Sequence, residues 1–180
     1  MARDASGMIL WEIARASAFV ALACYTLVVV WGIALAGRGF RPAAPAVEFH
    51  RFLSSLGLAA LAVHIGALLL DAYSKVHLTT LAGMNARPGI LAGVAAMWLV
   101  IALPLSIRLR RTKLISFRVW RRFHYFGYAV WVLAVAHGLA TGTDRGSSYA
   151  VAAYIGSALL VLAAAWWRWM EQPAPAREQA

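Results

Sequence analysis

Long apolar runs separated by short polar stretches extend along this chain almost from end to end. Five runs have about 20 residues each and almost no charge, which is the length a helix needs to cross the hydrocarbon core of a bilayer. They cover approximately residues 16–37, 52–72, 89–107, 123–142 and 149–167. The pattern predicts an all-α polytopic membrane helical bundle of about five transmembrane helices, forming a single domain over residues 1–180. Residues 171–180 are predicted to be a flexible tail.

The composition supports a membrane protein and excludes several other classes. Of the 180 residues 62% are hydrophobic and 13% are charged, whereas a soluble domain has about 25% charged residues. The five spans leave no room for a nucleotide-binding domain. Cys24 is the only cysteine, which excludes an intramolecular disulfide, a Cys-x-x-Cys metal site and covalent haem attachment through Cys-x-x-Cys-His.

The net charge of +10 comes from 17 Lys and Arg against 7 Asp and Glu. Most of the basic residues lie in short loops, so membrane topology explains them better than a nucleic acid partner does. One side of the predicted bundle has Arg38, Arg41, Arg51, Arg108, Arg110, Arg111, Lys113, Arg118, Arg121, Arg122, Arg168 and Arg177. The other side has only Arg3, Arg15, Lys75, Arg87 and Arg145. This asymmetry predicts a multi-pass protein of the inner (plasma) membrane with its N-terminus outside and its C-terminus in the cytoplasm.

Four histidines lie on or next to predicted spans, where ionisable groups are costly and usually functional. His50 and His64 belong to the second span, and His124 and His137 to the fourth. Because these two spans cross the membrane in the same direction, His50 should be level with His124, and His64 with His137. Fourteen helical residues rise about 21 Å and return to within about 40° of the same face, but thirteen leave His124 and His137 about 140° out of line. The second spacing therefore requires a tightened or tilted turn near the start of the fourth helix, or a different reach of the two imidazoles.

Two imidazoles at each of two depths suit haem better than zinc. Zinc needs three or four converging ligands, whereas haem iron takes one axial ligand on each face. We therefore expect two haems b, with the iron ligands paired as His50/His124 and His64/His137. Interhelical hydrogen bonds and a proton relay remain as alternative roles for these histidines. Gly57, midway between His50 and His64, is expected to lie against a flat macrocycle, with close helix packing as the alternative.

The chain from about Trp11 to Trp169 resembles the ferric reductase-like transmembrane domain superfamily. This superfamily includes ferric reductases, NADPH oxidases and the haem subunit of bacterial methionine sulfoxide reductase systems. The matching residues are Ala14-Arg15, His50-Arg51-x-Leu53, His64, Trp120-Arg121-Arg122-x-His124-Tyr125, His137-Gly138 and Gly142-Thr143-Asp144. The resemblance implies a helical bundle with b-type haems held between the second and fourth helices by these four histidines. Since the chain lacks flavin and nicotinamide domains, it is most similar to the short bacterial members.

Several other side chains are weaker candidates. Arg51 and Arg121 or Arg122 could pair with haem propionates, although topology alone also accounts for them. Asp71 could take up a proton or contact the outer haem, or could simply be solvated. His77 could serve an external acceptor or metal, or be an ordinary surface residue.

Together these features predict a membrane di-haem cytochrome b that passes electrons from a cytoplasmic flavin donor or quinol to an acceptor at the other face. Its expected partners are membrane lipid, a flavoprotein or quinol donor, and an external acceptor or partner redox protein, with flavin or quinone bound at the cytoplasmic side. It would be an oxidoreductase component served by a separate reductase. Two alternatives remain open. They are a haem-containing structural or interaction subunit of a larger redox complex, and a histidine-based proton or metal transporter.

Overall fold

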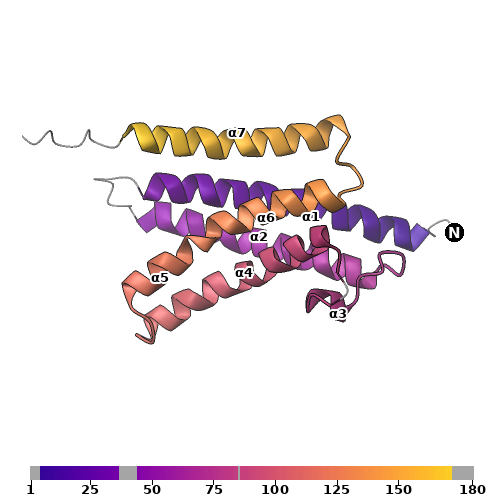
Figure 1. Ribbon diagram of the computed structural model, residues 1–180, viewed down its shortest axis with the longest axis horizontal. Coiled ribbons are helices and arrows are strands. Elements are labelled where there is room, and N and C mark those ends of the chain that lie inside the picture. Colours follow the sequence, from indigo (N-terminus) through magenta and orange to yellow (C-terminus); the bar gives the residue numbers. More distant parts are fainter. Residues whose placement is uncertain (1–4, 37–43, 85, 172–180) are drawn as a thin grey trace, which may run out of the picture.

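A computed structural model of the chain describes residues 5–36, 44–84 and 86–171, which form an all-α bundle (Figure 1). Its helices are α1 (Ala5–Leu35), α2 (Ala44–Leu70), α3 (Leu78–Leu81), α4 (Pro88–Arg111), α5 (Phe117–His124), α6 (Phe126–Thr141) and α7 (Ser148–Met170). No strand occurs among these residues. Of the tail predicted at 171–180, residues 172–180 lie outside the described part.

Five helical stretches are long and apolar enough to cross a membrane, which confirms the predicted polytopic helical bundle. They are α1, α2, α4, the stretch of α5 and α6 taken together, and α7. The helices extend beyond the purely apolar runs because charged and polar residues continue a helix outside the hydrocarbon. The 31 residues of α1 measure about 46 Å, against about 30 Å for the hydrocarbon core.

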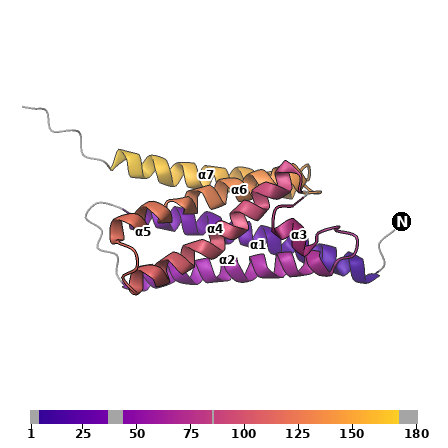
Figure 2. The same cartoon turned by 60° about the horizontal axis from the view of Figure 1, so that its bottom comes forward.

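Helix α1 lies at the centre of the packing. It contacts α2 most extensively and also contacts α6 and α7, while α4 packs along α6 (Figures 1 and 2). A buried cluster joins α1, α2, α4 and α6, and it consists of Ala21, Tyr25, Ala60, Val100 and Val130. Small and β-branched side chains predominate in it, which lets the helix backbones approach closely where no hydrophobic effect drives association.

The ends of the helices alternate between the two ends of the bundle. The end of α1, the start of α2, the α4–α5 turn and the end of α7 lie together (Figures 1 and 2). The start of α1, the α2–α4 connection with α3, and the α6–α7 loop lie at the opposite end. The alternation matches the predicted order of spans, so α2 and the α5–α6 stretch run in the same direction.

The predicted fourth span, expected as one helix over 123–142, is instead two helices that meet at Tyr125. The amide of Tyr125 donates to the carbonyl of Arg122 (3.3 Å), and the amide of Tyr128 donates to the carbonyl of Tyr125 (3.1 Å). These i→i−3 bonds are of the 3₁₀ type, which turns about 120° per residue instead of about 100°. The extra rotation acts in the direction needed to bring His124 toward the face of His137. The expected tightened turn is therefore present, between the two histidines.

Candidate cofactor site

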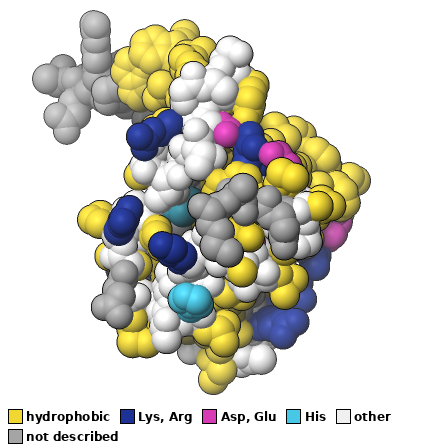
Figure 3. Space-filling model, turned by 90° about the vertical axis from the view of Figure 1, so that its right-hand side faces the viewer, with side chains coloured by type: hydrophobic (Ala, Val, Ile, Leu, Met, Phe, Trp, Pro, Cys, Tyr) yellow, Lys and Arg dark blue, Asp and Glu magenta, His cyan; other side chains and the backbone are white. Residues whose placement is uncertain are grey.

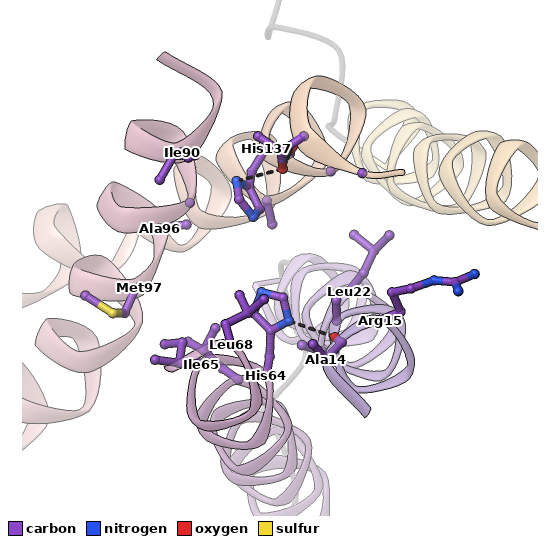
Figure 4. Close-up of a pocket in the computed structure, with 18 of the residues that line it drawn as sticks. Ala14, Arg15, Leu22, His64, Ile65, Leu68, Ile90, Ala96, Met97 and His137 are labelled. Carbon is purple, nitrogen blue, oxygen red and sulfur yellow. Dashed lines mark hydrogen bonds between the residues drawn. The ribbon is translucent and has the colours of Figure 1, made fainter. Parts of the chain in front are cut away.

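The structure brings the four membrane histidines together in the two predicted pairs. In the first pair, His50 of α2 faces His124 of α5 with ring centroids 6.2 Å apart and ring planes at 58°. In the second pair, His64 of α2 faces His137 of α6 at 6.5 Å and 79° (Figure 4). The first pair lies toward the α4–α5 turn and the second toward the α6–α7 loop.

These separations fit two imidazoles on opposite sides of one metal ion. A metal–imidazole bond is about 2.0 Å long and the bonding nitrogen lies about 1.1 Å from the ring centroid, so two such rings have centroids about 6.2 Å apart. Direct packing of two imidazoles face to face would bring the centroids closer. No group of three or more His, Cys, Asp or Glu able to hold a metal occurs among residues 5–36, 44–84 and 86–171. The donor set at each level is thus two imidazoles, which is too few for a zinc site but is a set that haem iron could accept.

Each histidine of the second pair is fixed by a main-chain carbonyl. The Nδ1 atom of His64 lies 2.8 Å from the carbonyl oxygen of Ala14 in α1, and Nδ1 of His137 lies 2.8 Å from that of Gly89 in α4. A carbonyl oxygen can only accept, so Nδ1 is the protonated nitrogen in both rings and Nε2 has the free lone pair. This arrangement is typical of histidines that bind a metal through Nε2.

The first pair has a different environment. The Nδ1 atoms of His50 and His124 and the Nε1 atom of Trp120 are buried and have no hydrogen-bond partner in the described part of the chain. The indole of Trp120 stacks on the His124 imidazole with centroids 5.0 Å apart and planes at 26°. The guanidinium of Arg110 lies 5.5 Å above the same indole. Buried polar atoms of this kind are uncommon and are usually explained by a bound group or by water.

A cavity of about 350 Å³ surrounds the second pair, within the usual range for a small-molecule site. Apolar side chains of α1, α2, α4 and α6 form most of its wall, among them Leu22, Ile65 and Met97 (Figure 4). Both His64 and His137 line it. A mostly apolar wall with two opposed imidazoles suits a porphyrin.

Gly93 of α4 makes room for His137, a role that the sequence analysis missed. A Cβ atom at this position would lie 2.6 Å from Nδ1 of His137, too close for any real contact. Gly89, whose carbonyl accepts from the same ring, precedes it by one helical turn. The two glycines form a small-x-x-x-small motif, and that motif was the available signal for a close approach to α4.

The structure corrects the interpretation of Gly57. A Cβ here would meet the Tyr25 ring at 3.1 Å and Cβ of Cys24 at 3.2 Å, so α1 covers this position. Gly57 is buried and lets α1 and α2 approach, which is the alternative that the sequence left open. Residues on the same face of α2 as His50 and His64 can meet a different neighbouring helix at a different height, and Gly57 meets α1.

We expect Gly57→Leu to destabilise the α1–α2 contact by about 1 to 3 kcal/mol, because the larger side chain must displace Tyr25 or Cys24. Thermal unfolding in detergent, followed by circular dichroism, measures the loss. Gly66→Leu is the matched control on the same helix, since a Cβ at Gly66 has no neighbour within 4 Å. Equal unfolding temperatures for the two variants would contradict this packing role.

The two arginines predicted near the cofactor lie at the surface. Arg51 pairs with Glu48 at 2.7 Å, with both side chains more than half exposed. Nε of Arg121 donates to the hydroxyl of Tyr125 at 3.4 Å, and Arg122 is exposed. The structure therefore assigns other partners to Arg51 and Arg121, and propionate binding by either remains a prediction.

Asp71 and His77 have local structural roles. Asp71 is buried, with 3% of its surface exposed, and its carboxylate accepts from the amide of Tyr73 at 3.0 Å. The interpretation of Asp71 as a solvated carboxylate is therefore wrong. His77 is exposed and caps the start of α3, where its amide donates to the hydroxyl of Thr80.

An ionic network closes the α6–α7 end of the cavity. Arg15 of α1 pairs with Asp144 of the α6–α7 loop and with Glu12 (2.7 Å), and the hydroxyl of Tyr149 donates to Asp144. Arg15 and Asp144 both line the cavity. Figure 3 looks onto this end and shows Lys, Arg, Asp and Glu side chains among hydrophobic ones. In the sequence, Arg15 and Asp144 stood out together only through the family resemblance. They are 129 residues apart, so their contact does not follow from spacing along one helix.

The network predicts a pH dependence. The hydrogen bond from Tyr149 and the bonds and charge of Arg15 hold the pKa of Asp144 below its ordinary value. The stabilisation of the folded state by ionised Asp144 is therefore complete above the unfolded pKa of about 3.9. It is lost as pH falls through the lower pKa of the folded state. The unfolding temperature of the wild type should exceed that of Asp144→Asn by a constant margin from pH 7 to about pH 4. Below about pH 4 this margin should shrink. Tyr149→Phe should narrow that margin, and parallel acid loss in wild type and Asp144→Asn would contradict the role of Asp144.

Comparison with known proteins gave no match of the chain to a family model, to a curated protein or to a solved structure. The function of the chain is therefore inferred from its residues and their geometry.

Proposed function

We propose that this chain is a membrane cytochrome that holds two haems b and moves electrons between a cytoplasmic flavoprotein or quinol and an acceptor at the other face. The supporting observation is the spacing of the two imidazole pairs, 6.2 and 6.5 Å between centroids. Both values suit axial ligands on either side of one iron ion. Membership of the ferric reductase-like superfamily is part of the same proposal, supported by the four histidines and their pairing.

Each pair of histidines would hold one of the two haems. His50 and His124 would hold one haem, and His64 and His137 the other. When bound, haem supplies a one-electron Fe(III)/Fe(II) couple, and the protein supplies position and environment. His50 and His64 are 14 residues apart on α2, a rise of about 21 Å, so the two sites divide a hydrocarbon core of about 30 Å.

The apolar wall of the cavity keeps water from the second pair. The Ala14 and Gly89 carbonyls orient its two imidazoles, and the stacked indole of Trp120 orients His124 in the first pair.

A reduced-minus-oxidised spectrum of the purified protein, combined with a haem-to-protein ratio, tests the proposal. We expect two haems b per chain and reduction by a flavin reductase or a quinol. A His77→Ala control should keep both haems, because His77 is exposed and caps α3. Colourless protein would refute the proposal and favour a histidine-based transporter. Haem that no donor reduces would refute it in favour of a structural subunit.

We also propose that the protein lies in the inner membrane with its C-terminus in the cytoplasm. The seven basic residues between Arg108 and Arg122 are all exposed, and the sequence has no Asp or Glu between Asp71 and Asp144. Short loops with such an excess of Lys and Arg stay on the cytoplasmic side.

The orientation predicts opposite labelling of two loops. In a Cys24→Ala background, Lys113→Cys in the α4–α5 turn should resist an impermeant thiol reagent applied to intact cells, and Ser147→Cys at the start of α7 should react. Permeabilised cells provide the control, since both cysteines should then react. Labelling of Lys113→Cys from outside would invert the orientation.

A further inference from the structure

The two histidine pairs differ in their hydrogen bonds. Both rings of the second pair donate from Nδ1 to carbonyl oxygens at 2.8 Å. Neither ring of the first pair has such an acceptor among the described residues, and the Nδ1 atoms of His50 and His124 are buried without a partner. The difference concerns all four rings, two with an acceptor and two without.

A hydrogen bond from Nδ1 makes an imidazole a stronger electron donor through Nε2. Loss of positive charge from the Nδ1–H group toward an acceptor raises the basicity of the opposite nitrogen. More basic axial ligands stabilise the more highly charged Fe(III) state, so the site gives up an electron more readily. The second pair should therefore favour the oxidised state relative to the first.

The surrounding charge acts in the same direction. The first pair lies at the end of the bundle with the α4–α5 turn, where Arg110 stacks over Trp120. The seven basic side chains from Arg108 to Arg122 at this end have no acidic neighbour in sequence. At the other end, Arg15 is paired with Glu12 and Asp144. Unneutralised positive charge favours acceptance of an electron at the first site.

We propose that the carbonyls of Ala14 and Gly89, with Gly93 as the residue that positions His137 against Gly89, make the second site the more reducing of the two. This inference depends on the proposed haem function. Gly93 is a positioning residue: it contacts His137 and acts through that ring. With this order, a single electron resides mainly at the first site, and the second site becomes reduced only afterwards.

Potentiometric titration of the holoprotein tests the order directly. His64→Ala leaves only the first site and His50→Ala leaves only the second, so each midpoint can be assigned. When the first site is half reduced, we expect the ratio of reduced to oxidised second site to be one tenth or less. This corresponds to a midpoint potential of the second site at least about 59 mV below that of the first. Equal midpoints, or the reverse order, would overturn the inference.

Gly93→Ala tests the hydrogen bond itself. The added methyl must move His137 away from the Gly89 carbonyl, because it would otherwise lie 2.6 Å from Nδ1. We expect the midpoint of the second site to rise toward that of the first, with the first unchanged. Gly66→Ala on α2 is the matched control and should change neither, since a Cβ there meets no atom within 4 Å. An unchanged second midpoint in Gly93→Ala with haem retained would overturn the inference.

Ser17→Ala keeps the test decisive if Gly93→Ala loses the second haem. The Ser17 hydroxyl lies 3.1 Å from the Ala14 carbonyl oxygen as well as 2.6 Å from that of Ile13. Its removal frees the Ala14 oxygen for His64, so the second midpoint should fall, the opposite sign from Gly93→Ala. No shift, or a rise, would overturn the inference. Absence of haem in the wild type would instead refute the proposed function, so the two failures are distinguishable.

Discussion

Alanine in place of His64 or of His137 should remove one and the same haem. Each change leaves a single axial imidazole at the second site and both imidazoles of the first pair in place. The ratio of haem to protein should fall from two to one, and the two variants should have superimposable reduced-minus-oxidised spectra. His50→Ala and His124→Ala should give the complementary spectrum, because the structure pairs His50 with His124 at 6.2 Å. The sum of the two difference spectra should reproduce the difference spectrum of the wild-type protein.

A double variant provides the control for this pairing. His64→Ala combined with His137→Ala should retain as much haem as either single change, whereas His64→Ala combined with His124→Ala should retain none. If His64→Ala and His124→Ala gave the same spectrum, the histidines would be paired differently. Circular dichroism checks that each variant keeps its helices.

The fold was predictable because the bilayer imposes one strong constraint. Five apolar runs of sufficient length predicted five spans, and the structure has five stretches that meet the same requirement. The boundaries were less predictable, since α1 begins at Ala5, well before the first apolar run. A tightened turn near the start of the fourth span was expected, because a histidine spacing of thirteen does not suit a regular helix. The break into two helices at Tyr125 was not expected.

The histidine pairs were predictable, and the residues around them were not. The depth of a residue in the membrane follows from its position in a span. Because the two histidine-bearing spans run in the same direction, the sequence predicted which histidines lie at the same depth. The roles of Gly93 and Trp120 depend on which helix faces which, and spacing within one helix does not determine that. Gly57 shows the same limit, because its face is covered by Tyr25 of α1.

Electrons from a cytoplasmic donor should arrive first at the site of His50 and His124. That site lies at the end of the bundle with seven exposed basic residues, which belong to the end of α4, the α4–α5 turn and α5. They would attract an acidic flavoprotein. Between this surface and His124 lies the stacked indole of Trp120, with Arg110 above it. In rapid mixing with a reduced flavin reductase, His64→Ala should be reduced quickly, and His50→Ala, which retains only the second site, should not.

Surface charge should control the rate of this step while both haem spectra stay unchanged. Neutralising Arg110, Arg111 and Lys113 together should slow reduction of the wild-type protein and weaken its dependence on salt, because a screened attraction has been removed. Neutralising Arg168 is the matched control, since it already pairs with Glu171 and should contribute little steering. Fast reduction of His50→Ala would contradict arrival at the first site. It would favour a quinol or an external donor near His64 and His137, where Arg15 and Asp144 line the cavity.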